Sequence, residues 1–318
     1  MRHNPTDNIQ FDLIENGLDF VSSGVEHILK DKSPHLLKYA ILHLSAGTEL
    51  LLKEILKNEH WSLIFENPNI AKYELLSTGE FKSVDFETLI TRLMNISEIE
   101  MSEKDISILR QLRKLRNKIE HFEFNQNTEA IKSLSSKVLC LLLNFINENF
   151  KINKLSDTSK EYVEKLRRDA IKFKEFATLR TAQIKTELTT AQKKYKMESC
   201  PLCRQAALVL NDDLQCLFCG YTDEAEKVSE LYAENILGES RYICMTDGGE
   251  FPVIECIHCG EETFVDKGTD GYVCFSCFET NQDSDLNSCS YCGQLFESRD
   301  DESEMCEYCV DYFINKDN

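Results

Sequence analysis

Long hydrophobic runs are missing from this sequence of 318 residues. No stretch of about 18 or more apolar residues occurs, so we expect no membrane-spanning helix. The first residues, MRHNPTDNIQFD, lack the apolar core of a signal peptide, which predicts a cytoplasmic protein. Hydrophobic residues still make up 42% of the chain, so the composition supports at least one core, and the length suggests two or more domains.

Basic residues are scarce in the last third of the chain. Only six of the 36 lysines and arginines follow Cys200, against 26 of the 55 acidic residues, a net charge of −20. Residues 1–199 hold 30 basic and 29 acidic residues, a net charge of +1. Nucleic-acid affinity depends largely on lysine and arginine neutralising phosphates, so general DNA binding by the acidic region is disfavoured. A basic protein partner suits this region better.

Cysteine is abundant where basic residues are scarce. Twelve of the 14 cysteines form six Cys-x-x-Cys pairs. The pairs are Cys200/Cys203, Cys216/Cys219, Cys256/Cys259, Cys274/Cys277, Cys289/Cys292 and Cys306/Cys309. Two such knuckles complete the tetrahedron of sulfur ligands that Zn²⁺ prefers, and an all-cysteine site leaves no position for a catalytic water. The sequence therefore predicts about three structural zinc sites in three zinc ribbons.

The grouping of the pairs stays open at this level. Pairing in sequence order leaves 12, 14 and 13 residues between knuckles, each enough for a hairpin, but an interleaved arrangement is also compatible with the 11 residues between Cys277 and Cys289. Disulfides need an oxidising compartment, and a redox dithiol would be a single pair beside a βαβ unit. We expect Cys140 and Cys244 to be packing residues and His258 not to be a ligand.

The first half of the chain has helical periodicity. We expect helices over residues 7–30, 34–57, 85–95, from Ser102 to about residue 122, and over 128–150. Residues 157–195 are expected to form one long helix. The stretch 151–196 holds thirteen basic and six acidic residues, so this helix is a candidate RNA track, or a spacer that docks by its apolar stripe.

The helix after Ser102 carries a polar motif in the segment LRKLRNKIEHF, residues 112–122. Arg116 and Asn117 are followed by His121. This arrangement resembles the motif of the HEPN family (higher eukaryotes and prokaryotes nucleotide-binding), an arginine, often followed by a polar residue, and a histidine a few residues later. The resemblance covers roughly residues 7–150 and implies an antiparallel helical bundle. Many members are metal-independent endoribonucleases that act as homodimers, and others only bind nucleotide or a partner.

The residue types suit RNA cleavage without a metal. The 2′-hydroxyl is the nucleophile, a histidine can move protons near neutral pH, and an arginine can stabilise charge on the phosphate. We therefore assign proton transfer to His121, phosphate binding to Arg116, and orientation of His121 or the phosphate to Asn117. Arg116 and His121 lie about 140° apart on a regular helix. Either the helix ends near His121, or a second copy contributes across a two-fold axis, so a homodimer is our working hypothesis.

Two other functions remain open. Arg116 and Glu120 could simply form an ion pair on a solvated helix face, which would make the protein a non-catalytic adaptor for nucleic acid or protein. A DNA-associated regulator is the least compatible with the charge. The expected fold is mostly α, an antiparallel HEPN-like bundle followed by a long helix and small β-rich zinc ribbons. The expected domains are the bundle 1–152, the basic connecting helix 153–198, ribbon one 199–224, a helix and linker 225–253, ribbon two 254–282 and ribbon three 283–318.

Overall fold

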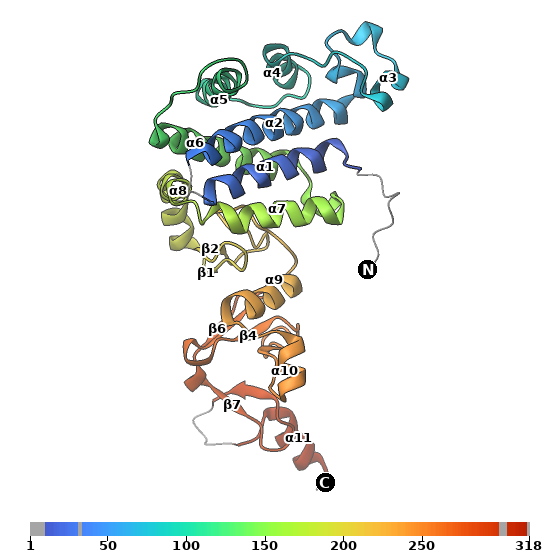
Figure 1. Ribbon diagram of the computed structural model, residues 1–318. Helices are drawn as coiled ribbons and strands as arrows, with labels where there is room; N and C mark the ends of the chain where they lie inside the picture. Colours follow the sequence, from blue (N-terminus) through green and yellow to red (C-terminus); the bar gives the residue numbers. More distant parts are fainter. Residues whose placement is uncertain (1–9, 31–33, 299–303, 317–318) are drawn as a thin grey trace. The chain divides into compact units, whose positions relative to one another are not determined.

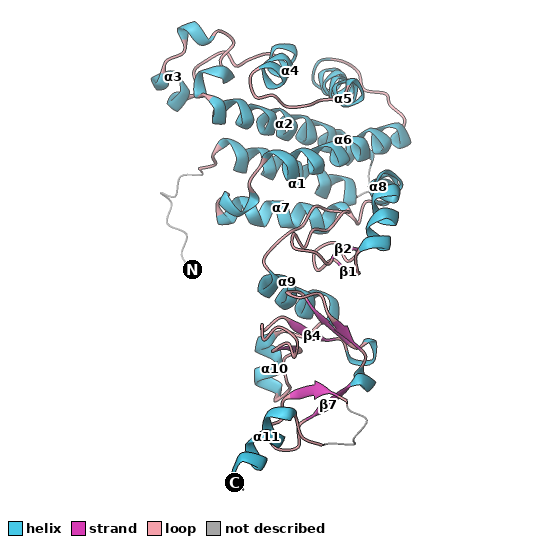
Figure 2. Ribbon diagram, turned by 180° about the vertical axis from the view of Figure 1, so that it is seen from behind, coloured by secondary structure: helices cyan, strands magenta, loops and turns pink. Residues whose placement is uncertain are grey.

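The computed structural model describes residues 10–30, 34–298 and 304–316 (Figure 1). The chain divides into two compact units, Met1–Gln183 and Ile184–Asn318. The first unit is helical, and the second holds every strand among the described residues (Figure 2). No helix in the described ranges is long and apolar enough to cross a membrane. The predicted fold class, a helical bundle followed by small antiparallel cysteine-bearing modules, is confirmed.

The helical unit follows the predicted periodicity closely. Its α-helices are α1 (Leu13–Leu29), α2 (Pro34–Glu59), α3 (Tyr73–Thr78), α4 (Phe86–Asn95), α5 (Glu103–His121), α6 (Thr128–Asn149), α7 (Asp157–Ala170) and α8 (Lys174–Lys194), which runs past the unit boundary. Short 3₁₀ turns cover Trp61–Ile64, Pro68–Ile70 and Ile152–Lys154. The predicted start of the first helix, at residue 7, lies outside the described residues.

Helix α2 is the centre of this unit. It packs against α1, α4, α5 and α6, and α7 packs on the other side of α1 (Figure 1). Helices α1 and α2 approach closely because small residues face each other. A Cβ added to Gly47 would lie 2.7 Å from the carbonyl oxygen of Gly17 and 2.7 Å from Cγ2 of Val21. The neighbouring leucines, Leu44 and Leu51, are fully buried, so the contact between the two helices excludes water.

The prediction of one long helix over 157–195 is wrong, because α7 ends at Ala170 and α8 begins at Lys174. The backbone N–H of Phe173 bonds to the carbonyl of Ala170 at 3.0 Å, which tightens the chain into a turn. The turn buries both Phe173 and Phe176. The sequence has no glycine or proline here that would predict a helix break. Docking by an apolar stripe holds for α7, which packs against α1 and buries Val163 and Leu166. The Tyr162 hydroxyl also donates to Asp19 of α1 at 3.0 Å.

The second unit is built from short strands. Strands β1 (Met197–Ser199) and β2 (Ala206–Val209) form an antiparallel hairpin. Helix α9 (Ala225–Tyr232) continues into a π-helical turn, Ala233–Leu237, and α10 (Arg241–Asp247) follows. A four-stranded antiparallel sheet then has the order β3 (Val253–Ile254), β4 (Phe264–Asp266), β5 (Tyr272–Cys274) and β6 (Thr280–Asn281). Short 3₁₀ turns lie at Gly268–Asp270 and Asp283–Asp285.

The last module differs from the β-rich ribbon that the sequence suggested. Its hairpin, β7 (Leu286–Ser288) with β8 (Leu295–Glu297), is as expected, but its second cysteine pair enters helix α11 (Glu307–Lys316). Cys309 lies in the first turn of this helix, and the N–H of Val310 bonds to the carbonyl of Cys306 at 3.0 Å. The third module is therefore a hairpin and a helix.

Candidate metal centres and the α5 motif

The twelve paired cysteines gather into three groups of four. The groups are Cys200, Cys203, Cys216 and Cys219; Cys256, Cys259, Cys274 and Cys277; and Cys289, Cys292, Cys306 and Cys309. Within each group all four sulfurs lie within 4.8 Å of one another. This resolves the grouping that the sequence left open, because each site joins pairs in sequence order and none is interleaved.

The sulfur spacing fits a tetrahedral metal site. The Sγ atoms are 3.7 Å apart for Cys200 and Cys219, for Cys256 and Cys277, and for Cys292 and Cys306. A zinc ion about 2.3 Å from four sulfurs gives tetrahedron edges of about 3.8 Å, whereas a disulfide bond is about 2.05 Å long. None of the 14 cysteines forms a disulfide bond. The residues therefore fit three metal sites of four cysteines each, and disulfide pairing does not occur.

The backbone of each knuckle folds its two sulfurs to one side. In the glycine knuckles, the N–H of Gly220, Gly260 and Gly293 bonds at 2.8 Å to the carbonyl of the first cysteine of the pair. These glycines have φ of 73°, 77° and 78°, a left-handed conformation that glycine adopts without strain. Arg204 and Phe278 adopt the same left-handed conformation without being glycine, with φ of 60° and 65°. Metal binding gives a physical reason to keep that strain.

Hydrogen bonds to sulfur favour the thiolate form that a metal requires. Burial raises the pKa of Cys274, but the backbone N–H of Cys277 and the hydroxyl of Thr263 outweigh it and bring the pKa down to about 7. Backbone N–H groups, chiefly that of Cys292, lower the pKa of Cys289 to about 6. Burial instead raises the pKa of the neighbouring Cys277 and Cys309, so hydrogen bonding favours the thiolate at one cysteine of a cluster while burial opposes it at another. A metal ion, which binds the deprotonated form, would offset that cost.

The remaining cysteines and His258 do not join a cluster. Cys140 is buried in α6, and burial raises the pKa of its thiol to about 11. Cys244 is buried in α10, where its sulfur lies 3.5 Å from the Glu239 carboxylate. His258 lies inside a knuckle, but its Nε2 is 2.9 Å from the Asn281 side-chain oxygen. Cys140 and Cys244 are thus buried side chains, as packing residues would be.

The polar motif occupies the last turn of α5. Ser102 caps the start of the helix by accepting the N–H of Asp105 at 3.1 Å, and the helix ends at His121. Arg116 and His121 are exposed, with 42% and 65% of their side-chain surface open to solvent. Asn117 is half-buried beside them, and its Oδ1 accepts a hydrogen bond from Nη1 of Arg116 at 3.1 Å.

Glu120 brings the motif together. Its Oε2 lies 2.9 Å from Nη1 of Arg116 and 3.9 Å from Nε2 of His121. A single anionic oxygen thus lies beside both the guanidinium and the imidazole of one chain. The helical wheel alone places these two groups far apart, and the long arginine side chain closes that distance. The pairing of Arg116 with Glu120 was the alternative left open by the sequence, and it is present.

A groove of about 400 Å³ runs along the neighbouring face of α5. Arg113, Lys114, Asn117, Lys118 and Phe122 line it, together with an ion pair between α5 and α4. In that pair, Nη2 of Arg110 lies 2.7 Å from the Glu87 carboxylate. Phe122 is 75% exposed directly after His121. Helix α5 ends at His121, and Phe122 follows in an extended conformation.

No family model, curated protein or solved structure matches the chain. The resemblance to the HEPN family therefore rests on the α5 motif and on the helical architecture around it.

Proposed function

We propose that the protein is a metal-independent endoribonuclease of HEPN type that carries three structural zinc sites. One observation carries the proposal: a single carboxylate oxygen of Glu120 lies within reach of both Arg116 and His121 at an exposed helix end. A phosphate oxygen of RNA has the same charge and similar hydrogen-bonding geometry. It can take the position of this carboxylate once the Glu120 side chain swings away.

The reaction divides among three side chains. His121 takes the proton from the 2′-hydroxyl, and the resulting alkoxide attacks the adjacent phosphorus. The bond from phosphorus to the 5′-oxygen breaks, that oxygen receives the proton from His121, and a 2′,3′-cyclic phosphate remains. Arg116 neutralises the charge that develops on the phosphate. Asn117, which accepts a hydrogen bond from Arg116, holds the guanidinium in place.

The cationic groove on α5 gives the RNA a path to this site. Arg113, Lys114 and Lys118 supply positive charge for the backbone phosphates, and the exposed Phe122 ring offers a surface on which a base can stack. The homodimer remains part of the proposal, and the mass of the protein in solution tests it. The three sites of four cysteines suit zinc in a structural role, because tetrahedral thiolate coordination leaves no open position.

Cleavage of a labelled RNA, compared among variants, tests the proposal. We expect His121→Ala and Arg116→Ala each to reduce the cleavage rate by at least about 100-fold, with helicity and zinc content unchanged. The matched control is Arg168→Ala on α7. Arg168 forms the same type of surface pair with Glu164 and is also 42% exposed. Unchanged cleavage by His121→Ala in a clean preparation would show that the activity comes from elsewhere.

A non-catalytic adaptor is the second candidate, and the ion pair between Arg116 and Glu120 favours it. If Glu120 permanently neutralises Arg116, the motif is a solvated helix end and no RNA is cleaved. Wild-type protein that binds RNA without cleaving it, with or without a divalent metal, would support this alternative.

A further inference from the structure

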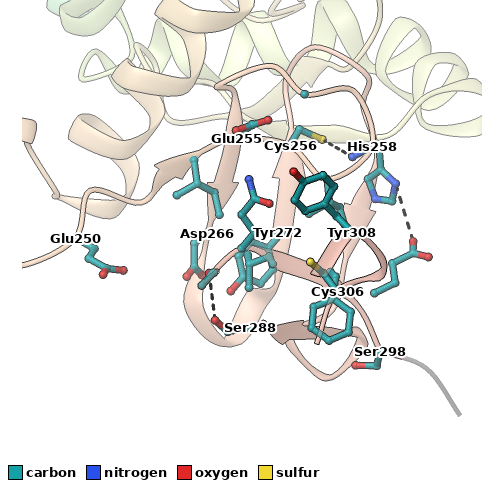
Figure 3. A pocket seen from close by; sticks show the side chains of 18 of the residues that line it. Glu250, Glu255, Cys256, His258, Asp266, Tyr272, Ser288, Ser298, Cys306 and Tyr308 are labelled. Carbon is teal, nitrogen blue, oxygen red and sulfur yellow. Dashed lines mark hydrogen bonds and ion pairs between the residues drawn. The ribbon is translucent and has the colours of Figure 1, made fainter. Parts of the chain in front are cut away.

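The acidic unit contains a groove that the α5 chemistry does not use. It has a volume of about 1050 Å³ and opens between the module of β3 to β6 and the module of β7, β8 and α11 (Figure 3). Pockets for small molecules are typically about 300–1,000 Å³, so this groove has room for a short stretch of peptide. Glu250 and Asp266 lie on one side of it, and His258 and Tyr308 lie on the other (Figure 3).

The lining is strongly acidic. It contributes five carboxylates and, among the described residues, no lysine or arginine. The carboxylates belong to Glu250, Glu255, Asp266, Glu297 and Glu307. Cys256 and Cys306 also reach the groove, one from each neighbouring cluster. A metal site with four thiolates has a net charge of about −2, so metal binding makes the groove more negative.

Two basic residues in the described part of this unit, Arg241 and Lys267, form ion pairs with carboxylates outside the groove lining. The Arg241 guanidinium is 3.4 Å from Glu230, and Nζ of Lys267 is 2.7 Å from Glu198. Neither residue lines the groove. Among the described residues that line the groove, His258 is the one with a basic side chain, and its Nδ1 lies 4.0 Å from the Glu297 carboxylate. The negative charge of the groove therefore favours a cationic ligand.

The carboxylates are dispersed along the groove. Within the described parts of the chain, the groups of side chains close enough to share a metal ion are the three cysteine clusters, and none includes a groove carboxylate. A single divalent cation would require several oxygens around one point. Spaced carboxylates match several cationic side chains along one strand of peptide.

Aromatic rings stand among these carboxylates. Tyr272 and Phe296 are buried in the walls, while Tyr308 is 77% exposed at the rim. Lysine and arginine bind favourably over the face of such rings. This unit already contains one example, because the Arg241 guanidinium lies 4.6 Å from the ring centre of Phe251, a groove residue. Acidic and aromatic groups together select lysine and arginine side chains over a nucleic acid, whose phosphates the carboxylates repel.

We propose that this groove binds an extended, lysine- and arginine-rich segment of a partner protein. The proposal does not depend on the ribonuclease assignment, because it uses no residue of α5.

Binding of a labelled peptide that alternates lysine, arginine and serine tests the groove, with the full-length, metal-loaded protein at physiological salt. We expect the double variant Glu250→Lys/Glu255→Lys to weaken binding by about tenfold or more. The matched control is Glu226→Lys/Glu234→Lys, which changes the net charge equally at exposed sites outside the groove. This control should change the affinity by less than about twofold.

Three outcomes would overturn the proposal. The two double variants could weaken peptide binding equally, or a peptide with serine in place of each basic residue could bind as tightly as the basic peptide. Spermine could also displace the labelled peptide more effectively than unlabelled peptide does. Tyr308→Ala should weaken binding about threefold and Tyr308→Phe should retain it, because phenylalanine keeps the ring face. Metal content is measured for each variant. If Glu255→Lys loses metal, the single variants Glu250→Lys and Glu226→Lys are compared instead. Glu250→Lys should then weaken peptide binding more than Glu226→Lys.

Discussion

The helical unit and the cysteine-bearing unit exclude water from their interiors by different means. In the first unit, α1 and α2 meet along glycines and leucines with no room for one more carbon atom at Gly47. In the second unit the strands are two to four residues long, and the buried side chains cluster around cysteines such as Cys256 and Cys274. Strands this short are unstable without further support. The comparison predicts that side-chain packing alone stabilises the helical unit, whereas the cysteine-bearing unit requires bound metal to stay folded.

Metal removal should produce the largest difference between the units. Structural zinc contributes about 10–16 kcal/mol per site in small zinc-finger peptides, so chelation should unfold the second unit and leave the helical unit folded. Hydrogen exchange measured with and without chelator checks this, and protection of α1 and α2 should persist. As a control, Cys203→Ser should reduce the bound metal from three ions to two, while Cys140→Ser in α6 should leave three. Simultaneous loss of protection in both units would contradict the comparison.

A methyl group at Gly47 should affect only the helical unit. Because the added carbon would lie 2.7 Å from the Gly17 carbonyl oxygen, the helices must separate, and we expect the free energy of unfolding to fall by about 1–3 kcal/mol. Denaturant unfolding followed by helicity measures this. The control is Gly249→Ala in the other unit, where the nearest atom is 4.0 Å away. That change should cost less than about 0.5 kcal/mol.

A surface ion pair within the helical unit should have the smallest effect. Lys165 of α7 bonds to Glu26 of α1 and lowers the pKa of that carboxyl. A lowered pKa means that the ionised form stabilises the fold above the pKa of the unfolded chain, and this contribution is lost as the pH falls through the folded value. Both side chains are more than a third exposed, at 36% and 39%, so screening limits the effect to about 0.5 kcal/mol.

Lys165→Met should therefore lower the unfolding free energy by about 0.5 kcal/mol at pH 7, and the difference from wild type should vanish below about pH 4. Urea unfolding at a series of pH values measures the difference. Lys160→Met on the same helix is the control, because Lys160 pairs with Asp157 of α7 itself. A difference that grows on acidification would show that Lys165 acts through packing.

The metal sites could be predicted from the sequence because a Cys-x-x-Cys knuckle fixes ligand type and local geometry together. Their grouping could not, since spacings of 11 to 14 residues allow more than one partner. The break between α7 and α8 has no glycine or proline to mark it and follows from the burial of Phe173 and Phe176. The groove of the acidic unit could not be predicted from the sequence either. Its residues Glu250, Asp266 and Tyr308 come from segments that only the tertiary fold brings together.

The α5 motif lies between these cases. The sequence pattern indicated the residue types and a helix that ends near His121, and α5 does end there. The shared contact with Glu120 was not, because it depends on how the Arg116 side chain bends along the helix surface. Angles around a helix axis give the direction of each Cα–Cβ bond, but they do not give the conformation of a long side chain.

The position of Cys309 in the first turn of α11 has a consequence for the end of the chain. An isolated helix of ten residues is marginal in water, because its first turn must be ordered before later hydrogen bonds compensate. An ion bound by Cys306 and Cys309 would fix that turn in advance. It would thus act as the nucleus of the helix, and the exposed Tyr308 ring in the same turn would keep its position only while the ion is bound.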